Sequence, residues 1–125
     1  EHELRYLRIG ADDDEDGRSV TRHQLKRALA NAFIMEFGRG EDALVALAGI
    51  RPDLLVTDHR LTGRSGLELV REVRQRGYRF PIVMLSGLDS VSAEALDAGA
   101  NEFVSTATAS LGVTVAKLLA YRRDR

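Results

Sequence analysis

The alternation of short apolar runs with segments of helical period is the feature that most limits how this chain can fold. Five apolar runs have the length of buried parallel strands, and they read as Leu4–Ala11, Phe33–Phe37, Asp53–Thr57, Pro81–Ser86 and Asn101–Ser105. The intervening and final segments predict helices at about Glu15–Asn31, Glu41–Ala48, Ser65–Gly77, Ser90–Ala98 and Ala109–Arg122. This order is typical of repeated βα units, so we expect an α/β domain built on a mostly parallel five-stranded sheet.

The third predicted helix has a clear apolar face. Leu67, Val70, Val73 and Arg74 recur at helical spacing, and Gly77 stands where a C-terminal cap is expected. Such a stripe indicates a helix that lies on a sheet and contributes to the core.

The size and composition of the chain exclude several classes of protein. At 125 residues with 44% hydrophobic content, the chain predicts one domain over 1–125, although a start at Glu1 leaves open an excised piece of a longer protein. A net charge of -1 gives no general attraction to nucleic acid or to anionic membranes. The absence of cysteine excludes disulfides and thiolate metal sites. Because no signal peptide or long apolar segment is evident, we expect a cytoplasmic protein.

Acidic residues follow two of the predicted strands. Asp12–Asp14 come after the run Leu7–Ala11, and Asp58 comes after Asp53–Thr57. The carboxyl ends of parallel strands open on one edge of the sheet, so these carboxylates should share a crevice there. A cluster of this kind is costly unless it binds a cation or holds protons, which predicts a divalent metal, a raised pKa, or both.

Two other interpretations of the first acidic run remain open at this point. It could be a solvated loop whose charges favour the N-terminus of the next helix. It also matches the first half of a calcium-binding EF-hand loop through Asp12, Asp14, Asp16 and Gly17, but His23 stands where a bidentate Glu is required.

A glycine motif beginning at Gly38 imitates the dinucleotide-binding fingerprint. The motif Gly38-Arg39-Gly40 follows a predicted strand and opens a helix. Glu41 and Asp42 argue against this interpretation, because two carboxylates at the helix N-terminus would repel a pyrophosphate.

The combined order of the motifs resembles the receiver domain of two-component response regulators, and the similarity covers essentially the whole chain. The similar segments are the apolar strand with its acids, the long stretch around Asp58, the fourth strand with its terminal hydroxyl, and the turn before the fifth strand: Ile9–Asp14, Arg51–Leu69, Pro81–Gly87 and Ala98–Ala100. The resemblance implies a three-layer (βα)5 flavodoxin-like domain with a parallel sheet in the order 2-1-3-4-5.

The resemblance also implies a set of site residues. Asp58 would accept a phosphoryl group, and Ser86 would donate its hydroxyl to that group. Mg2+ would be held by Asp13 directly, by Asp12 mainly through water, by Asp58 and by the backbone carbonyl of Arg60. The metal would neutralise the charge that develops during transfer.

One position departs from the family pattern. Thr106 and Ala107 stand where the family has a lysine and a proline after the fifth strand. The loss of that lysine predicts a pocket without a fixed positive charge, a raised carboxyl pKa in the metal-free state, and poor transmission of the phosphorylated state. The bond between Thr106 and Ala107 is expected to be trans, because a cis bond before a non-proline residue is costly.

Three further residues lie close in sequence to the expected site or to the fifth strand. Phe103 occupies the position of the family's switch aromatic, and plain core filling explains it equally well. Thr62 replaces a frequent proline, which should loosen the loop after Asp58. His59 is adjacent to Asp58 and could act as an acid–base group. We expect a surface or packing role instead, because no positioned partner is evident.

The function expected from this pattern is that of a phosphoacceptor receiver in a phosphorelay. Its partner would be a histidine kinase or a histidine phosphotransfer protein, with an output domain or a second copy docked on the last helix–strand–helix face. We expect no enzymatic turnover beyond self-phosphorylation and self-dephosphorylation, no direct nucleic-acid contact and no membrane contact. The alternative is a pseudo-receiver that acts as a protein-interaction module without phosphorylation.

Overall fold

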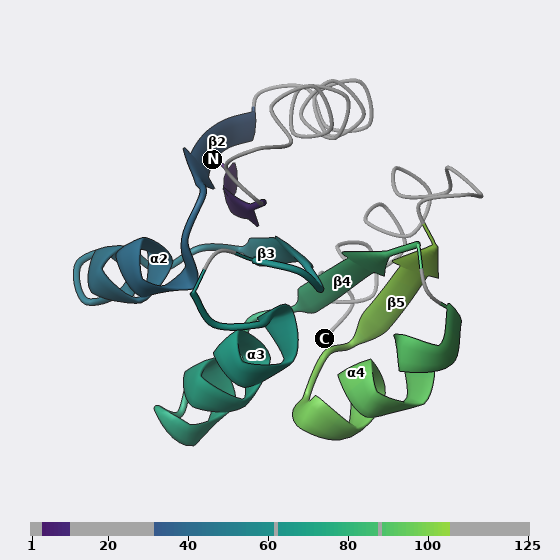
Figure 1. Cartoon of the computed structure of the whole chain (residues 1–125). Helices are drawn as coiled ribbons and strands as arrows, with labels where there is room; N and C mark the ends of the chain where they lie inside the picture. Colours follow the sequence, from purple (N-terminus) through teal and green to yellow (C-terminus); the bar gives the residue numbers. More distant parts are fainter. Residues whose placement is uncertain (1–3, 11–31, 62, 88, 106–125) are drawn as a thin grey trace, which may run out of the picture.

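Five parallel strands form one sheet in the order β2-β1-β3-β4-β5, as predicted (Figure 1). The structure, a computed structural model, describes residues 4–10, 32–61, 63–87 and 89–105. Its strands are β1 (Leu4–Ile9), β2 (Ala32–Phe37), β3 (Leu54–Asp58), β4 (Ile82–Ser86) and β5 (Glu102–Ser105). The described helices are α2 (Gly40–Leu47), α3 (Gly66–Gln75), the short 3-10 helix η1 (Asp89–Val91) and α4 (Ser92–Ala98).

The predicted strands are confirmed, with small corrections at their ends. β1 ends at Ile9, before the predicted end, although the N–H of Gly10 still donates to the carbonyl of Phe37 (2.9 Å). β3 runs one residue later than predicted: Asp58 joins the strand, and Asp53 precedes it, where its carboxylate accepts the N–H of Arg5 (3.0 Å).

The helix predicted at Ser90–Ala98 begins as η1, and only Ser92–Ala98 is α-helical. The segments Glu15–Asn31 and Ala109–Arg122, which were also predicted as helices, lie outside the described residues. No helix within the described ranges combines the length and apolar character that a bilayer crossing requires.

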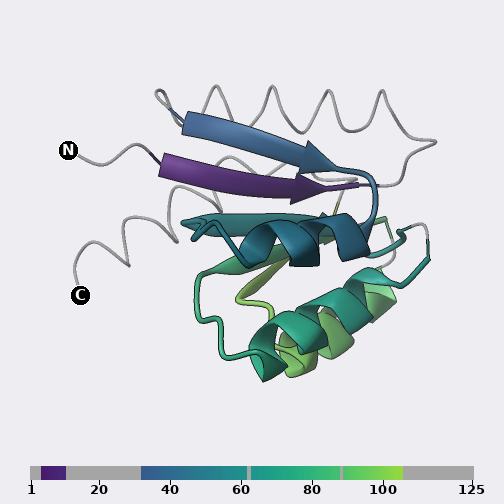
Figure 2. The ribbon, with the colours of Figure 1, turned by 90° about the vertical axis from the view of Figure 1, so that its left-hand side faces the viewer.

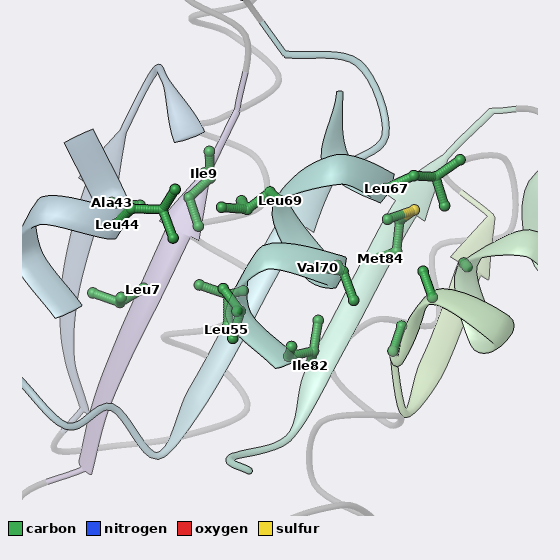
Figure 3. Close-up of a cluster of buried hydrophobic side chains, with 14 of the residues drawn as sticks. Leu7, Ile9, Ala43, Leu44, Leu55, Leu67, Leu69, Val70, Ile82 and Met84 are labelled. Atoms are coloured by element: carbon green, nitrogen blue, oxygen red, sulfur yellow. The ribbon is translucent and has the colours of Figure 1, made fainter. Parts of the chain in front are cut away.

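The helices α2, α3 and α4 pack on one face of the sheet (Figure 2). Alternate strand residues meet them there, and the best-buried members of this cluster include Leu7, Ile9, Leu55, Ile82 and Met84 (Figure 3). The intervening residues are buried on the opposite face: Tyr6, Arg8, Leu54, Val56, Val83, Leu85 and Val104. Because both faces are covered, the strands are continuous apolar runs instead of alternating ones. Arg8 is the charged residue within these buried apolar runs.

α3 shows how local sequence and tertiary contacts combine. Ser65 and Glu68 form a capping box at its start, and Gly77, with φ of +91°, follows its last turn as the sequence predicts. Val70 and Val73 are fully buried, as expected from the stripe. Arg74, predicted on the same stripe, is only half-buried, and its guanidinium bonds to groups beyond the helix.

Candidate functional site

Asp58 lies at the carboxyl end of the central strand β3. Its side chain is 19% exposed, so it is reachable from solvent yet largely enclosed. Asp58 pairs in register with Leu85 of β4, and the N–H of His59 donates to the carbonyl of Leu85 (2.8 Å). Pairing with β4 therefore fixes the backbone at Asp58 and at the residue after it.

A buried arginine lies beside this carboxylate. The Nη2 atom of Arg8 is 2.8 Å from Oδ1 of Asp58, and the Arg8 side chain is only 2% exposed. Register places Arg8 opposite Val56, so Arg8, Val56 and Asp58 belong to the same face of the sheet. Arg8 also donates through Nη1 to the carbonyl of Ile9. The guanidinium is thus fixed at two points and directed toward the carboxyl edge.

The prediction that the pocket lacks a fixed positive charge is wrong. The expectation rests on Thr106 at the family's lysine position, whereas Arg8 supplies a positive charge from within β1. The sequence does contain a signal for Arg8, because a charged residue within a buried apolar run requires a partner. The ion pair with Arg8 supplies, at Asp58, the positive charge that the lysine argument assumed to be absent.

The loop after β3 folds back against Asp58. The N–H of Gly66 donates to the carbonyl of His59 (2.7 Å). A Cβ atom on Gly66 would lie 2.1 Å from the carbonyl oxygen of Asp58, much too close for any side chain. Gly63 adopts φ of +90°, which favours glycine. The two glycines of this motif therefore allow the tight return from β3 to α3.

His59 does not gain a catalytic partner at its Nδ1 atom. That nitrogen is buried and has no hydrogen-bond partner within the part of the chain that the structure describes. A packing role, as the sequence favours, is consistent with this environment.

Ser86 and Phe103 lie on the two strands beyond β3. Ser86 ends β4, one residue beyond the register partner of Asp58, and its side chain is 8% exposed. Ser86 pairs in turn with Ser105 of β5. Phe103 pairs with Met84 and packs, partly buried, against the core cluster. The fold thus brings Asp58 and Ser86 to neighbouring strand ends, and Phe103 contributes at least to the core.

The other predicted site residues fall outside the described ranges. They are Asp12, Asp13, Asp14, Thr62, Thr106 and Ala107. Among the residues that are described, no group of three acidic or histidine side chains forms a metal site. Asp58 and the backbone of Arg60 are the described contributors to the predicted ligand set.

Comparisons with known proteins agree with this geometry. Residues 9–110 match the family model of the response regulator receiver domain. The chain is 39% identical over 94 residues to the response regulator MprA of Mycobacterium ulcerans, covering 72% of this chain and 40% of that protein. It is 40% identical over 102 residues to MprA of Mycobacterium leprae, covering 78% of this chain and 43% of that protein. The chain therefore spans about two fifths of the length of these curated relatives.

Solved structures show the same architecture. The response regulator TrrA of Thermotoga maritima, in complex with Mg(2+)-BeF, superposes with a TM-score of 0.79 at 25% identity, covering 92% of this chain and 98% of that chain. The receiver domain of the Francisella response regulator 1452 gives a TM-score of 0.83 at 20% identity, covering 98% and 99% of the two chains. The second likeness concerns the fold alone.

Proposed function

This chain belongs to the family of response regulator receiver domains, and on that premise we propose that it accepts a phosphoryl group on Asp58 in a two-component phosphorelay. The observation that carries this proposal is the place of Asp58: a partly exposed carboxylate at the carboxyl end of the central strand, ion-paired with Arg8. Open α/β sheets bind their ligands at this edge. The guanidinium favours the ionised carboxylate, which is the nucleophilic form.

We assign the metal site to Asp58, the backbone carbonyl of Arg60, Asp13 and, through water, Asp12. These are oxygen donors, which suit Mg2+, and the partial exposure of Asp58 fits a ligand that a hydrated ion can reach. When bound, Mg2+ supplies neutralisation of the phosphoryl oxygens during transfer. The TrrA structure, a complex with Mg(2+)-BeF, supports the choice of metal.

The partners follow from this chemistry. The donor would be a histidine kinase or a histidine phosphotransfer protein in the cytoplasm. The greater length of the curated relatives is compatible with an output domain joined to this one. We assign no catalytic turnover to the chain beyond its own phosphorylation and dephosphorylation, and no direct contact with nucleic acid or membrane.

The test is intact mass after incubation with acetyl phosphate and Mg2+. We expect one phosphoryl adduct, which is absent from Asp58→Asn and from samples treated with a chelator. Asp53→Asn is the matched control, since Asp53 precedes the same strand but lies beside Arg5 at its other end. That variant should keep the adduct.

Each variant needs a fold check by circular dichroism, because Asp58→Asn removes the charge that faces Arg8. A folded wild-type chain that binds Mg2+ but forms no adduct would reject phosphoryl transfer. The result would favour the alternative, an interaction module that works without phosphorylation, for which the replacement of the family's lysine by Thr106 is the motivating feature.

A further inference from the structure

We infer that Arg8 is a positioning residue for the acceptor, whose guanidinium serves as the fixed counter-ion of Asp58 from within β1. This inference rests on the proposed function for its kinetic consequence. The charge reaches the carboxylate from β1, the strand next to β3 in the sheet, whereas the family's lysine follows the fifth strand.

Burial makes the Arg8 position demanding. A guanidinium with 2% exposure is costly to desolvate unless charged and hydrogen-bonding partners compensate. Asp58 is an acidic partner, at 2.8 Å, and the carbonyl of Ile9 accepts a further bond. The contact with Asp58 joins the paired strands β1 and β3, so the backbone ladder fixes its geometry, while the contact with Ile9 lies within β1 itself. A charge held in this way orients the carboxylate before any ligand arrives.

The same charge should weaken cation binding at the site. Arg8 contacts Oδ1 of Asp58, and a metal bound to this carboxylate would lie within a few ångströms of the guanidinium. Two like charges at such a distance repel by an amount that corresponds to about tenfold in affinity, even with solvent screening. Removal of the Arg8 charge should therefore tighten the binding of Mg2+.

Arg8 should also shorten the lifetime of the phosphorylated state. During transfer, Oδ2 forms a bond to phosphorus while the bond from phosphorus to the donor breaks and the donor keeps its electron pair. Oδ1 then becomes the carbonyl oxygen that faces Arg8. On hydrolysis, a water oxygen bonds to phosphorus, loses its proton to solvent, and the bond from phosphorus to Oδ2 breaks. The carboxylate that leaves is stabilised by the guanidinium.

The experiment compares wild type with Arg8→Met, Arg8→Lys and Arg76→Met. The last is the matched control, because Arg76 is an exposed arginine that pairs with Glu72 (3.0 Å) far from the acceptor edge. Isothermal titration gives the Kd of Mg2+, and timed intact mass gives the half-life of phosphorylated Asp58. For Arg8→Met we expect a Kd about tenfold lower and a half-life at least about threefold longer. Arg8→Lys should stay closer to wild type, and Arg76→Met should match it.

A third readout does not need phosphoryl transfer. Urea midpoints for Arg8→Met, Asp58→Ala and the double variant form a double-mutant cycle without metal. Asp58→Ala alone should unfold at lower urea than the double variant, because it leaves the buried guanidinium without that carboxylate. If Arg8→Met does not fold, Arg8→Gln takes its place as a polar side chain without the charge.

Different results would reject the proposed function and the role of Arg8. Absence of an adduct in the folded wild type rejects the proposed function, while the Mg2+ titration and the urea cycle still test Arg8. A Kd and a half-life for Arg8→Met within about twofold of wild type, a difference worth only a few tenths of a kcal/mol, together with an additive cycle, would overturn the role of Arg8.

Discussion

Gly66 shows how a single residue shapes the acceptor site. The start of α3 lies against the backbone of Asp58, and a Cβ at position 66 would meet the carbonyl oxygen of Asp58 at 2.1 Å and the Cα of His59 at 3.1 Å. Backbone atoms at the end of a paired strand cannot move aside as a flexible side chain can. The absence of a side chain at Gly66 is therefore a requirement of the loop that carries Arg60.

Gly66→Ala should lower the free energy of unfolding by about 2–4 kcal/mol, because the added methyl group forces the loop away from β3. Urea denaturation measures this change. Gly49→Ala is the control, since a Cβ at Gly49 has no neighbour within 4 Å. The control should be neutral or stabilising by up to about 1 kcal/mol. Equal midpoints for the two variants would contradict the steric argument.

At the scale of the element, the start of α3 is stabilised by a charged cap. The N–H of Ser65 donates to Oε1 of Glu68 (3.0 Å), and the N–H of Glu68 donates to the hydroxyl of Ser65 (3.2 Å). The hydrogen bond from the Ser65 backbone to the Glu68 carboxylate, and after it the interaction of that carboxylate with the Ser65 side chain, lower the pKa of Glu68 below its ordinary value of 4.5. The charged form of Glu68 is thus the one that the folded state prefers.

Glu68 should make the stability of the fold depend on pH. A carboxyl whose pKa is lower in the folded state stabilises the fold above its unfolded value, 4.5, and loses this contribution as the pH falls through the folded pKa. Glu68→Gln should therefore have a flatter stability profile than wild type below about pH 5. Thermal melts across this range measure the difference. Glu94→Gln, in the first turn of α4, is the control. Parallel profiles for Glu68→Gln and wild type would refute this role.

At the scale of the whole molecule, Arg74 connects α3 to the turn between α4 and β5. Its Nε donates to the carbonyl of Gly99 (2.9 Å), and its two Nη atoms donate to the carbonyl of Tyr78 (3.0 Å) and to Oδ1 of Asn101 (2.9 Å). Oδ1 of Asn101 also accepts the N–H of Ile82 at the start of β4 (2.8 Å). Partial burial lowers the pKa of Arg74, since desolvation disfavours its charge. One side chain thus joins a helix, a strand and a turn at the amino end of the sheet, opposite the acceptor edge.

Arg74→Met should lower the free energy of unfolding by about 1–3 kcal/mol, because three acceptors lose a charged donor. Amide hydrogen exchange at Ile82 and Asn101 should accelerate, while phosphorylation of Asp58 should persist. Arg71→Met is the control, since Arg71 is exposed on the same helix. Exchange rates at Ile82 that do not change would show that Arg74 is dispensable for this junction.

The sequence by itself determined the order of the strands and of the helices that the structure describes, because apolar runs of strand length alternate with helical stripes such as the one through Val70 and Val73. It also placed Asp58 at a strand end and, through the family resemblance, predicted the strand order. The tertiary structure decided the partners of Arg8 and Arg74. Their contacts join residues 50 and 27 positions apart, Arg8 with Asp58 and Arg74 with Asn101. Periodicity reports which side of an element is buried, but only the register between strands decides which side chains meet there.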